Sequence, residues 1–238
     1  WMAQGARVSS NLLYDNWAQD LFLEVSHGPY IVDNNISLSP RTIQENTDGG
    51  AYLHNLFSGD INRLDDQRYT PYHLNHSTEV KGIRTITEGD HRFYNNIFIG
   101  GSNDKLKYGM VVFDVSQRPM YAENNLFLNG ALPMTNKTKD WVEKDVNPKL
   151  KIEETANGEV YLVSDINLQE LAAFQGKGID ASRLGITQLT GFPFEHFDGT
   201  PFRLERDFFG KERTVSPMVG PVESLPASKR IRVWPNGL

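Results

Sequence analysis

Two short segments of the chain gather side chains that can carry chemistry, and the first centres on Glu24. In residues 20–29, which read DLFLEVSHGP, strand alternation puts Glu24 on one side and the apolar Leu23 and Val25 on the other. Because an apolar set belongs inside a packed sheet, the pattern predicts that Glu24 faces outwards, on the lateral surface. Such a carboxyl either serves as a general acid or is merely solvated.

The sequence around Glu24 favours the chemical role. Trp17, Phe22 and His27 are close in sequence, and the strand leads into a Gly-Pro turn. Aromatic neighbours can desolvate a carboxyl and so keep it protonated, as a general acid requires. The sequence therefore singles out Glu24 as the candidate acid/base group.

The second segment carries three titratable side chains, His73, His76 and Glu79. Imidazole and carboxylate groups suit zinc, but Pro71 and the non-helical context do not favour presenting these three together. Contacts with sugar hydroxyls, or structural polar packing, are the favoured interpretations. We expect no metal and no cofactor at this segment.

Asparagine shows how the chain that positions these residues is organised. Of the 19 Asn residues, 14 lie before residue 131, most of them in a recurring phrase of Asn followed by apolar residues. One Asn of each phrase is taken as equivalent to the others, and successive members are 24, 20, 41 and 29 residues apart. They are Asn11, Asn35, Asn55, Asn96 and Asn125. A repeat of about 20–30 residues indicates a solenoid. The gap of 41 is interpreted as two turns of about 20.

Asn suits one fixed place in each turn because it tolerates the left-handed conformation, and because its amide can join a ladder between stacked coils. Each phrase is flanked by Gly, Asp or Pro and contains short runs typical of strands. The prediction is an all-β fold, a right-handed parallel β-helix over residues 1–130. An Asn-rich loop region in an ordinary β-sandwich is the alternative.

Beyond residue 130 the repeat fades. Residues 131–200 are predicted to form a small C-terminal β-rich cap or appended module, with a hairpin around Asn157-Gly158. A short helix capped by Asp165 should follow and end at Gly176. Residues 201–238 are predicted to contribute a final strand at 202–204 and then an extended tail.

Composition excludes several classes of function. The net charge of −6 argues against binding nucleic acid, and the absence of Cys excludes disulfides and thiolate metal sites. No apolar run approaches the roughly 20 residues that span a membrane, so no membrane partner is expected. The sequence starts at Trp1 without a signal peptide and is expected to be a fragment. The sequence does not determine the compartment or the oligomeric state. The bacterial cytoplasm or periplasm is the expected compartment.

The coil geometry indicates how Glu24 could acquire a partner. Hydrolysis of a glycosidic bond with retention needs two carboxyl groups about 5–5.5 Å apart, and neighbouring coils lie about 4.8 Å apart. One coil after Glu24 lie Glu45 and Asp48, whereas one coil earlier falls just ahead of Trp1. From the spacing alone, either place could supply the second carboxylate.

Several ordered stretches resemble glycoside hydrolase family 120, the β-xylosidase family. They are WMAQG (1–5), DLFLEVSHGP (20–29), VDNN (32–35), GGAYLHNLF (49–57), TPYH (70–73), HSTE (76–79) and RFYNNIF (92–98). The similarity covers residues 1–130 well, with a weaker match at DFFGK (207–211), and the chain corresponds to the C-terminal part of a family chain. The resemblance implies a right-handed β-helix that hydrolyses xylo-oligosaccharides with retention, an exo-acting β-xylosidase-like glycosidase.

The resemblance also assigns roles. It implies that Glu24 is the general acid/base and that the nucleophile is an aspartate directly before Trp1, so that this polypeptide would be catalytically incomplete. From position and residue type, the residues expected to bind the sugar are Trp1, His27, His54, His76 and Glu79, with Trp1 or Trp17 stacking on its ring. The expected partner is a xylo-oligosaccharide or a related small glycoside.

Two rival functions remain. A polysaccharide lyase would need a row of basic residues on one face, and Lys81, Arg84 and Arg92 are too scattered to supply that row. A non-catalytic carbohydrate-binding β-helix would need aromatic platforms but no carboxyl pair.

Overall fold

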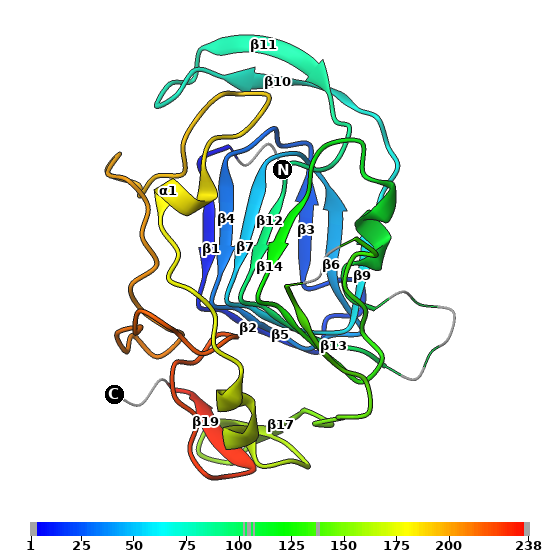
Figure 1. The fold of residues 1–238 in the computed structure, drawn as a ribbon, viewed down its shortest axis with the longest axis vertical. Coiled ribbons are helices and arrows are strands. Elements are labelled where there is room, and N and C mark those ends of the chain that lie inside the picture. The colour runs from blue at the N-terminus through cyan, green and yellow to red at the C-terminus, as the bar shows by residue number, and fades with distance from the viewer. Residues whose placement is uncertain (1–3, 102, 104–105, 107, 137–138, 236–238) are drawn as a thin grey trace.

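The chain winds through three parallel sheets in turn (Figure 1). The computed structural model describes residues 4–101, 103, 106, 108–136 and 139–235, and its strands and helices all lie within those ranges. Sheet A has the order β1 (Arg7–Ser9), β4 (Tyr30–Asp33), β7 (Gly50–Leu53), β12 (Arg92–Tyr94), β14 (Tyr121–Glu123). Sheet B has the order β2 (Leu12–Leu13), β5 (Ile36–Ser37), β8 (Leu56–Ser58), β13 (Ile97–Ile99), β15 (Leu126–Leu128), β16 (Trp141–Glu143). Sheet C has the order β3 (Leu21–Glu24), β6 (Arg41–Asn46), β9 (Asp60–Arg63).

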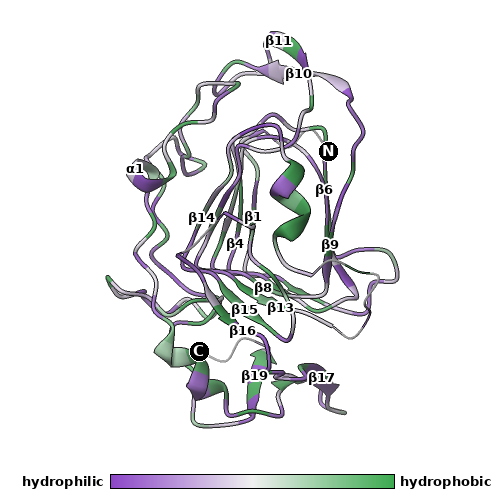
Figure 2. Cartoon of the chain, turned by 45° about the vertical axis from the view of Figure 1, so that its right-hand side comes forward, coloured by the Kyte–Doolittle hydropathy of each residue, from purple (hydrophilic) through white to green (hydrophobic). Residues whose placement is uncertain are grey.

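We call one passage of the chain through the sheets a coil, and successive coils stack in register. Val32 of β4 pairs with Val8 on one side and with Tyr52 of β7 on the other, and Tyr52 pairs with Phe93 of β12. Because parallel strands in register place like residues over like, the apolar side chains form continuous columns inside the coils. Figure 2 shows the same stacking in sheet B, where the hydrophobic strands β8, β13 and β15 lie side by side. The prediction of a mostly β chain with stacked repeats is confirmed.

The predicted asparagine ladder runs along the corner between sheets A and B. The Asn55 amide nitrogen donates to Asn96 Oδ1 at 3.0 Å, and Asn55 Oδ1 accepts from Asn35 Nδ2 at 3.0 Å. Asn11 and Asn125 extend this chain of amides in the same way. The direct bond between Asn55 and Asn96 corrects one expectation, because the gap of 41 residues is a single coil with an insertion rather than two turns.

That insertion is an antiparallel hairpin, β10 (Tyr69–His73) and β11 (Val80–Thr85). We call residues 69–85 the arm. It arches over one end of sheets A and C in Figure 1, and its base is closed by the Ile86 N–H, which donates to the Arg68 carbonyl at 2.9 Å. A second insertion, between β13 and β14, contains the 3₁₀ helix η1 (Val111–Val115).

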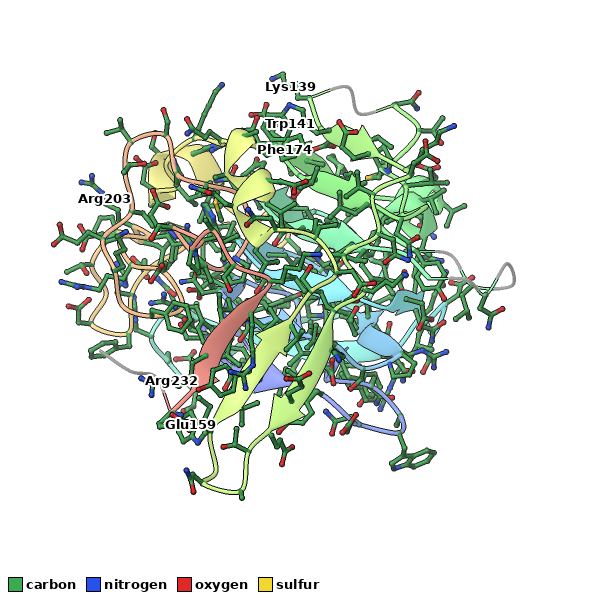
Figure 3. All side chains as sticks on the ribbon, turned by 90° about the horizontal axis from the view of Figure 1, so that it is seen from below. Lys139, Trp141, Glu159, Phe174, Arg203 and Arg232 are labelled. Carbon is green, nitrogen blue, oxygen red and sulfur yellow. The ribbon has the colours of Figure 1, made fainter. Side chains whose placement is uncertain are left out.

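Below sheet B in Figure 1, β17 (Lys151–Glu154), β18 (Val160–Val163) and β19 (Arg230–Trp234) form an antiparallel sheet. The hairpin predicted around Asn157-Gly158 is therefore present. The buried side chains of this sheet belong to one apolar cluster with residues of β5, β8, β13 and β15, so it covers sheet B across several coils. The predicted helix is the 3₁₀ helix η2 (Leu168–Ala173), which is capped by Asn167 rather than Asp165. Trp141 of β16 contacts Phe174 beyond η2, with ring centroids 5.7 Å apart (Figure 3).

Residues 201–238 differ from the expectation of a strand followed by a surface tail. No strand forms at 202–204 in the described chain. Phe202 and Leu204 are instead buried side chains that pack near the helix α1 (Ala181–Leu184). The later stretch returns to the core, since Val219 and Val222 are buried and β19 completes the antiparallel sheet. No helix in the described residues is long and apolar enough to cross a membrane.

Candidate active site

Glu24 lies at the end of β3, where sheet C turns towards sheet A. Leu23 is buried in the interior while the Glu24 side chain keeps about 21% of its exposure. The alternation predicted from the sequence therefore holds, and Glu24 is outside the packed core. Its carboxylate accepts a hydrogen bond from the guanidinium of Arg68, the residue before the arm.

The predicted aromatic enclosure of Glu24 is not formed by the described side chains. Trp17 is 98% exposed and Phe22 is 40% exposed, because the loop before β3 leaves Trp17 in solvent. The group that contacts Glu24 is the cation of Arg68. The sequence did not identify Arg68, although its place five residues before His73 in the second titratable segment was a usable signal.

The residue that faces Glu24 from the next coil is Asn46. The register of β3 and β6 pairs Leu23 with Glu45 and Glu24 with Asn46. A shift of one residue moves a side chain to the other face of a strand, so Glu45 points inwards. Of the places that the spacing left open for the second carboxylate, this register therefore gives no support to Glu45.

Glu45 instead belongs to a polar cluster sealed inside the coils. It accepts hydrogen bonds from Thr47 Oγ1 and from the Tyr52 hydroxyl, and the Tyr30 hydroxyl lies 3.5 Å from its Oε1. Burial raises the pKa of Glu45 to about 7. His91 Nε2 is 3.6 Å from Glu45 Oε1, and burial lowers the pKa of His91 to about 3.

Asp48 is also buried, at the corner between β6 and β7. Its Oδ2 is 3.4 Å from His27 Nδ1 and its Oδ1 is 3.3 Å from Arg118 Nε. Both Asp48 and the His27 ring are enclosed, with 1% and 0% of their side chains exposed. Protein covers both side chains, so the structure gives no support to His27 as a sugar-binding residue.

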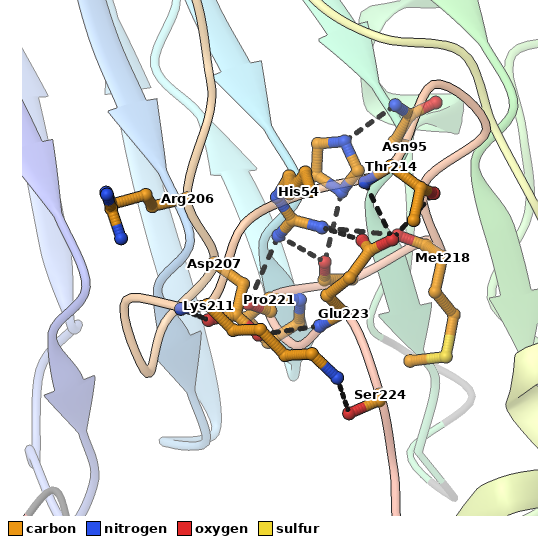
Figure 4. Close-up of polar contacts among 12 residues, drawn as sticks. His54, Asn95, Arg206, Asp207, Lys211, Thr214, Met218, Pro221, Glu223 and Ser224 are labelled. Carbon is orange, nitrogen blue, oxygen red and sulfur yellow. Dashed lines mark hydrogen bonds and ion pairs between the residues drawn. The ribbon is translucent and has the colours of Figure 1, made fainter. Parts of the chain in front are cut away.

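His54 is buried as well. Its Nδ1 lies 3.1 Å from the Gly220 carbonyl and its Nε2 2.7 Å from Asn95 Nδ2, contacts that Figure 4 shows around the ring. Burial, with help from the charge of Arg213, lowers the pKa of His54 well below its ordinary value. The segment around Gly220 covers His54, which the sequence could not reveal because 166 residues separate the two.

A cleft of about 620 Å³ opens where the arm tip meets the coil corners. Its walls come from residues 4–7, 29–31, 73–78 and 193–197. His76, one of the predicted sugar-binding residues, lines this cleft, and its Nε2 is 2.9 Å from Glu195 Oε2. Phe197, also in the lining, presents a fully exposed ring. Segment 193–197 was not recognised from the sequence as part of a site.

Of the remaining predicted binding residues, Glu79 falls outside the cleft. Glu79 is an exposed residue at the arm tip and is not part of the lining, and Trp1 lies outside the described residues. His73 Nδ1 is 3.0 Å from the Thr78 carbonyl. Among the described residues, no group of three or more His, Cys, Asp or Glu is arranged to hold a metal ion.

The basic residues considered for a lyase do not form a row. Arg92 is buried and paired with Asp90 at 2.8 Å, whereas Lys81 donates to the Thr190 carbonyl at 3.0 Å. Arg84 is exposed on β11. Because these cations serve different contacts on different elements, they give no support to the lyase alternative.

The three stacked parallel sheets place the chain among solenoid proteins. Its candidate site adds an outward-facing carboxyl group, that of Glu24, at a corner of a coil. No protein-family model matches the chain, and no match was found among curated proteins. Among solved structures, the chain is similar to XylC in its complex with xylose, with a TM-score of 0.88 and 35% sequence identity. The match covers 98% of this chain and 40% of that chain. This chain therefore spans about two fifths of the length of its xylose-binding neighbour.

Proposed function

We propose that this chain is a right-handed parallel β-helix portion of a retaining glycosidase that acts on xylo-oligosaccharides, with Glu24 as its general acid/base. The observation that carries the proposal is the similarity to XylC with xylose, at 35% identity over 98% of this chain. The position of Glu24, outward at the end of β3, is compatible with proton transfer to a bound sugar.

The proposed chemistry is a double displacement. Protonated Glu24 gives its proton to the glycosidic oxygen while a carboxylate nucleophile attacks the anomeric carbon, and the leaving sugar departs as an alcohol. Ionised Glu24 then takes a proton from the water that cleaves the glycosyl ester. The family resemblance draws the nucleophile from an aspartate directly before Trp1. Within the next coil, the buried Glu45 and Asp48 are unsuited to this attack.

The cleft supplies a place for the rest of the saccharide. Arg68, beside Glu24, directly precedes strand β10, which ends with His73 at the cleft wall, so five residue steps separate Arg68 from His73. At about 3.3 Å per residue, these five steps cover roughly 17 Å. His76, Glu195 and the exposed Phe197 ring offer hydrogen-bonding groups and an apolar face, the combination that sugar sites use.

Binding without hydrolysis is the second candidate function. It is favoured by the register of β3 and β6, which faces Glu24 with the amide of Asn46 rather than a carboxylate. Isothermal titration with xylobiose, beside an assay for released reducing sugar, separates the two. Heat of binding without product supports the binding function for this chain.

The hydrolytic function is tested with the longest encoded protein that contains these residues and with p-nitrophenyl β-xyloside. Replacing Glu24 by Gln should lower kcat on unactivated xylobiose by about 10²–10⁴-fold. The loss should be smaller on p-nitrophenyl xyloside, because its leaving group needs little protonation. An equal loss on both substrates would contradict the acid role.

Glu143→Gln is the matched control. Glu143 is an exposed carboxyl at the end of β16, on the last strand of sheet B and far along the stack from β3. The same chemical change there should leave kcat on both substrates unaltered. A comparable loss in Glu143→Gln would show that the assay reports general instability rather than proton transfer.

A further inference from the structure

We propose that Glu195 selects the sugar that occupies the cleft, favouring a neutral unit with free hydroxyl groups over an acidic one. The arm tip holds one carboxylate oxygen of Glu195 and leaves the other oxygen to accept from the sugar. The inference deepens the proposed function and rests on it, because the saccharide that reaches the cleft is the one proposed to be cleaved at Glu24.

The cleft is a place for a sugar unit of its own. It encloses about 620 Å³, within the roughly 300–1,000 Å³ of ligand sites. Its walls include the arm tip, residues 73–78, and segment 193–197. Neither Glu24 nor Arg68 belongs to the described lining. A sugar in the cleft is therefore a different unit from the one beside Glu24.

The fold fixes where Glu195 lies on the cleft wall. It follows Phe194, which is buried in the core, and its side chain keeps about 21% of its exposure. The backbone turns back tightly after it, since the His196 N–H donates to the Thr200 carbonyl at 2.9 Å. The Phe202 N–H then donates to the Phe194 carbonyl at 3.1 Å. The carboxylate is thus carried by an anchored turn rather than by a loose loop.

The two carboxylate oxygens of Glu195 have different surroundings. Asn75 Nδ2 donates to Oε2 at 3.2 Å, and His76 Nε2 lies 2.9 Å from the same oxygen. Oε1 accepts from no donor in the described part of the chain, and it is not among the buried polar atoms that lack a partner. An unpartnered oxygen that is not buried is reached by solvent. Because Glu195 lines the cleft, Oε1 is available to a hydroxyl group bound there.

The arm that supplies the contacts to Oε2 is itself fastened to the rest of the molecule. Lys81 Nζ donates to the Thr190 carbonyl at 3.0 Å. The Gln4 amide accepts from the His73 N–H and donates to the His73 carbonyl, both at 3.0 Å. The arm tip therefore approaches Glu195 from a fixed position, so the carboxylate is oriented before a sugar binds.

The charges in the cleft favour a neutral sugar. Among the described residues of the lining, Glu195 is the one acidic side chain and Arg7 is the one arginine or lysine. Arg7 gives Nε and Nη2 to the buried Asp33 at 2.7 and 2.8 Å, and its Nη1 has no acceptor among the described residues. A hydroxyl group both donates and accepts, so neighbouring sugar hydroxyls can donate to Glu195 and accept from Arg7. A carboxylate on the sugar would instead be repelled by Glu195.

Isothermal titration of the whole chain measures this selectivity, with Glu24→Gln in every protein so that hydrolysis does not consume the ligand. The two ligands are xylotriose and the same trisaccharide carrying one glucuronic acid. Glu195→Gln should weaken xylotriose binding by roughly 5–10-fold, the difference between a charge-assisted and a neutral hydrogen bond. The same change should strengthen binding of the acidic ligand by roughly 2–5-fold, because it removes one partly exposed like charge.

Asn75→Ala tests the part of the arm tip. It should weaken xylotriose binding by a smaller factor than Glu195→Gln, because Oε1 stays in place but is less well oriented. In the double variant with Glu195→Gln, Asn75→Ala should add no further loss, since it acts through that carboxylate. A full additional loss in the double variant would show that Asn75 contacts the sugar by itself and would overturn the assigned division of the two oxygens.

Glu212→Gln is the matched control. Glu212 is an exposed carboxylate outside the cleft lining, 3.8 Å from Arg206, and its replacement should alter the affinity for neither ligand. If Glu195 only supports the arm, Glu195→Gln will weaken both ligands alike, and this outcome would overturn the inference. Unchanged xylotriose binding in Glu195→Gln, or no xylotriose binding by the parent chain, would overturn it as well.

Hydrolysis is assayed separately, with p-nitrophenyl β-xyloside and the longest encoded protein. If no xyloside is cleaved while Glu195→Gln exchanges neutral for acidic affinity, hydrolysis fails as the function and the selectivity of the cleft stands. If the xyloside is cleaved and Glu195→Gln leaves both affinities unchanged, the inference fails alone. The two failures are therefore distinguishable.

Discussion

Removing one amide from the middle of the asparagine ladder should destabilise the protein far more than removing the first one. Asn55 is completely buried. Its Oδ1 accepts from the backbone N–H of Asn35 at 2.9 Å and from Asn35 Nδ2 at 3.0 Å. Its Nδ2 donates to the Val32 carbonyl at 2.9 Å and to Asn96 Oδ1 at 3.0 Å. All the hydrogen-bonding capacity of this side chain is thus used between coils.

The magnitude follows from the groups that Asn55→Ala leaves without partners. Two N–H groups of Asn35 lose their acceptor and the Val32 carbonyl loses a donor, whereas Asn96 Oδ1 keeps the bond from the backbone of residue 55. At about 1–3 kcal/mol for each of these three orphaned buried groups, the loss of folding free energy should be about 3–9 kcal/mol. Water cannot replace these bonds, since the neighbouring rungs are also buried.

Asn11→Ala is the matched control. Asn11 is half-buried, and no donor among the described residues reaches its amide oxygen. Its Nδ2 donates to Asn35 Oδ1 and to the Ser9 carbonyl, and Asn35 Oδ1 keeps a second bond from the backbone of residue 11. The expected loss is about 1 kcal/mol.

Urea unfolding followed by tryptophan fluorescence and by far-ultraviolet circular dichroism measures both variants. The two probes must give coincident transitions, since a stacked-coil protein can unfold in parts. With coincident transitions and an unchanged slope, the shift in midpoint gives the loss of free energy. Equal losses in Asn55→Ala and Asn11→Ala would refute the argument that the ladder is sustained by bonds between coils.

Two further outcomes follow from other buried positions. Because burial raises the pKa of Glu45 from 4.5 to about 7, the folded state holds this proton more tightly, so its stabilising contribution is complete below pH 4.5 and lost as the pH rises through 7. Unfolding free energy should fall by about 3 kcal/mol across that window, and Glu45→Gln should flatten this part of the profile measured by urea unfolding from pH 4.5 to 7.5. At Gly28, where φ is +68° and an added Cβ would lie 2.4 Å from the Gly49 carbonyl oxygen, substitution by Ala should cost about 3 kcal/mol or more. Gly158→Ala, at φ +79° with open space around it, should cost only about 1 kcal/mol, and similar thermal midpoints for the two variants would contradict the close-approach argument.

The local sequence pattern was sufficient to predict the features that repeat along the chain. The recurrence of Asn predicted which residues form the ladder, but the gap of 41 residues between Asn55 and Asn96 is one coil rather than two. The left-handed corner is made by the residue before each ladder Asn, such as Asn34 and Asn95, while the ladder Asn supplies the amide that bonds to the next coil. The alternation around Glu24 predicted its outward direction for a similar reason, since a strand of period two leaves only two faces. The Asn-Gly hairpin followed from turn chemistry alone.

The local sequence pattern could not predict the register between strands, or which residues are buried by segments distant in the sequence. The spacing left Glu45 open as a partner of Glu24, and one residue of register places it inside the coil with Tyr52. His27 and His54 carry the same imidazole as His76, but segments distant in sequence cover the first two and leave the third at the cleft.

The sequence by itself thus determined that the chain stacks coils and that Glu24 points out of them. Only the tertiary structure decided which of the other titratable groups are accessible, how the arm brings Arg68 to Glu24, and where the cleft opens. The physical reason is that repetition acts through neighbouring residues, whereas burial and register depend on contacts between segments whose separation in the chain carries no local signal.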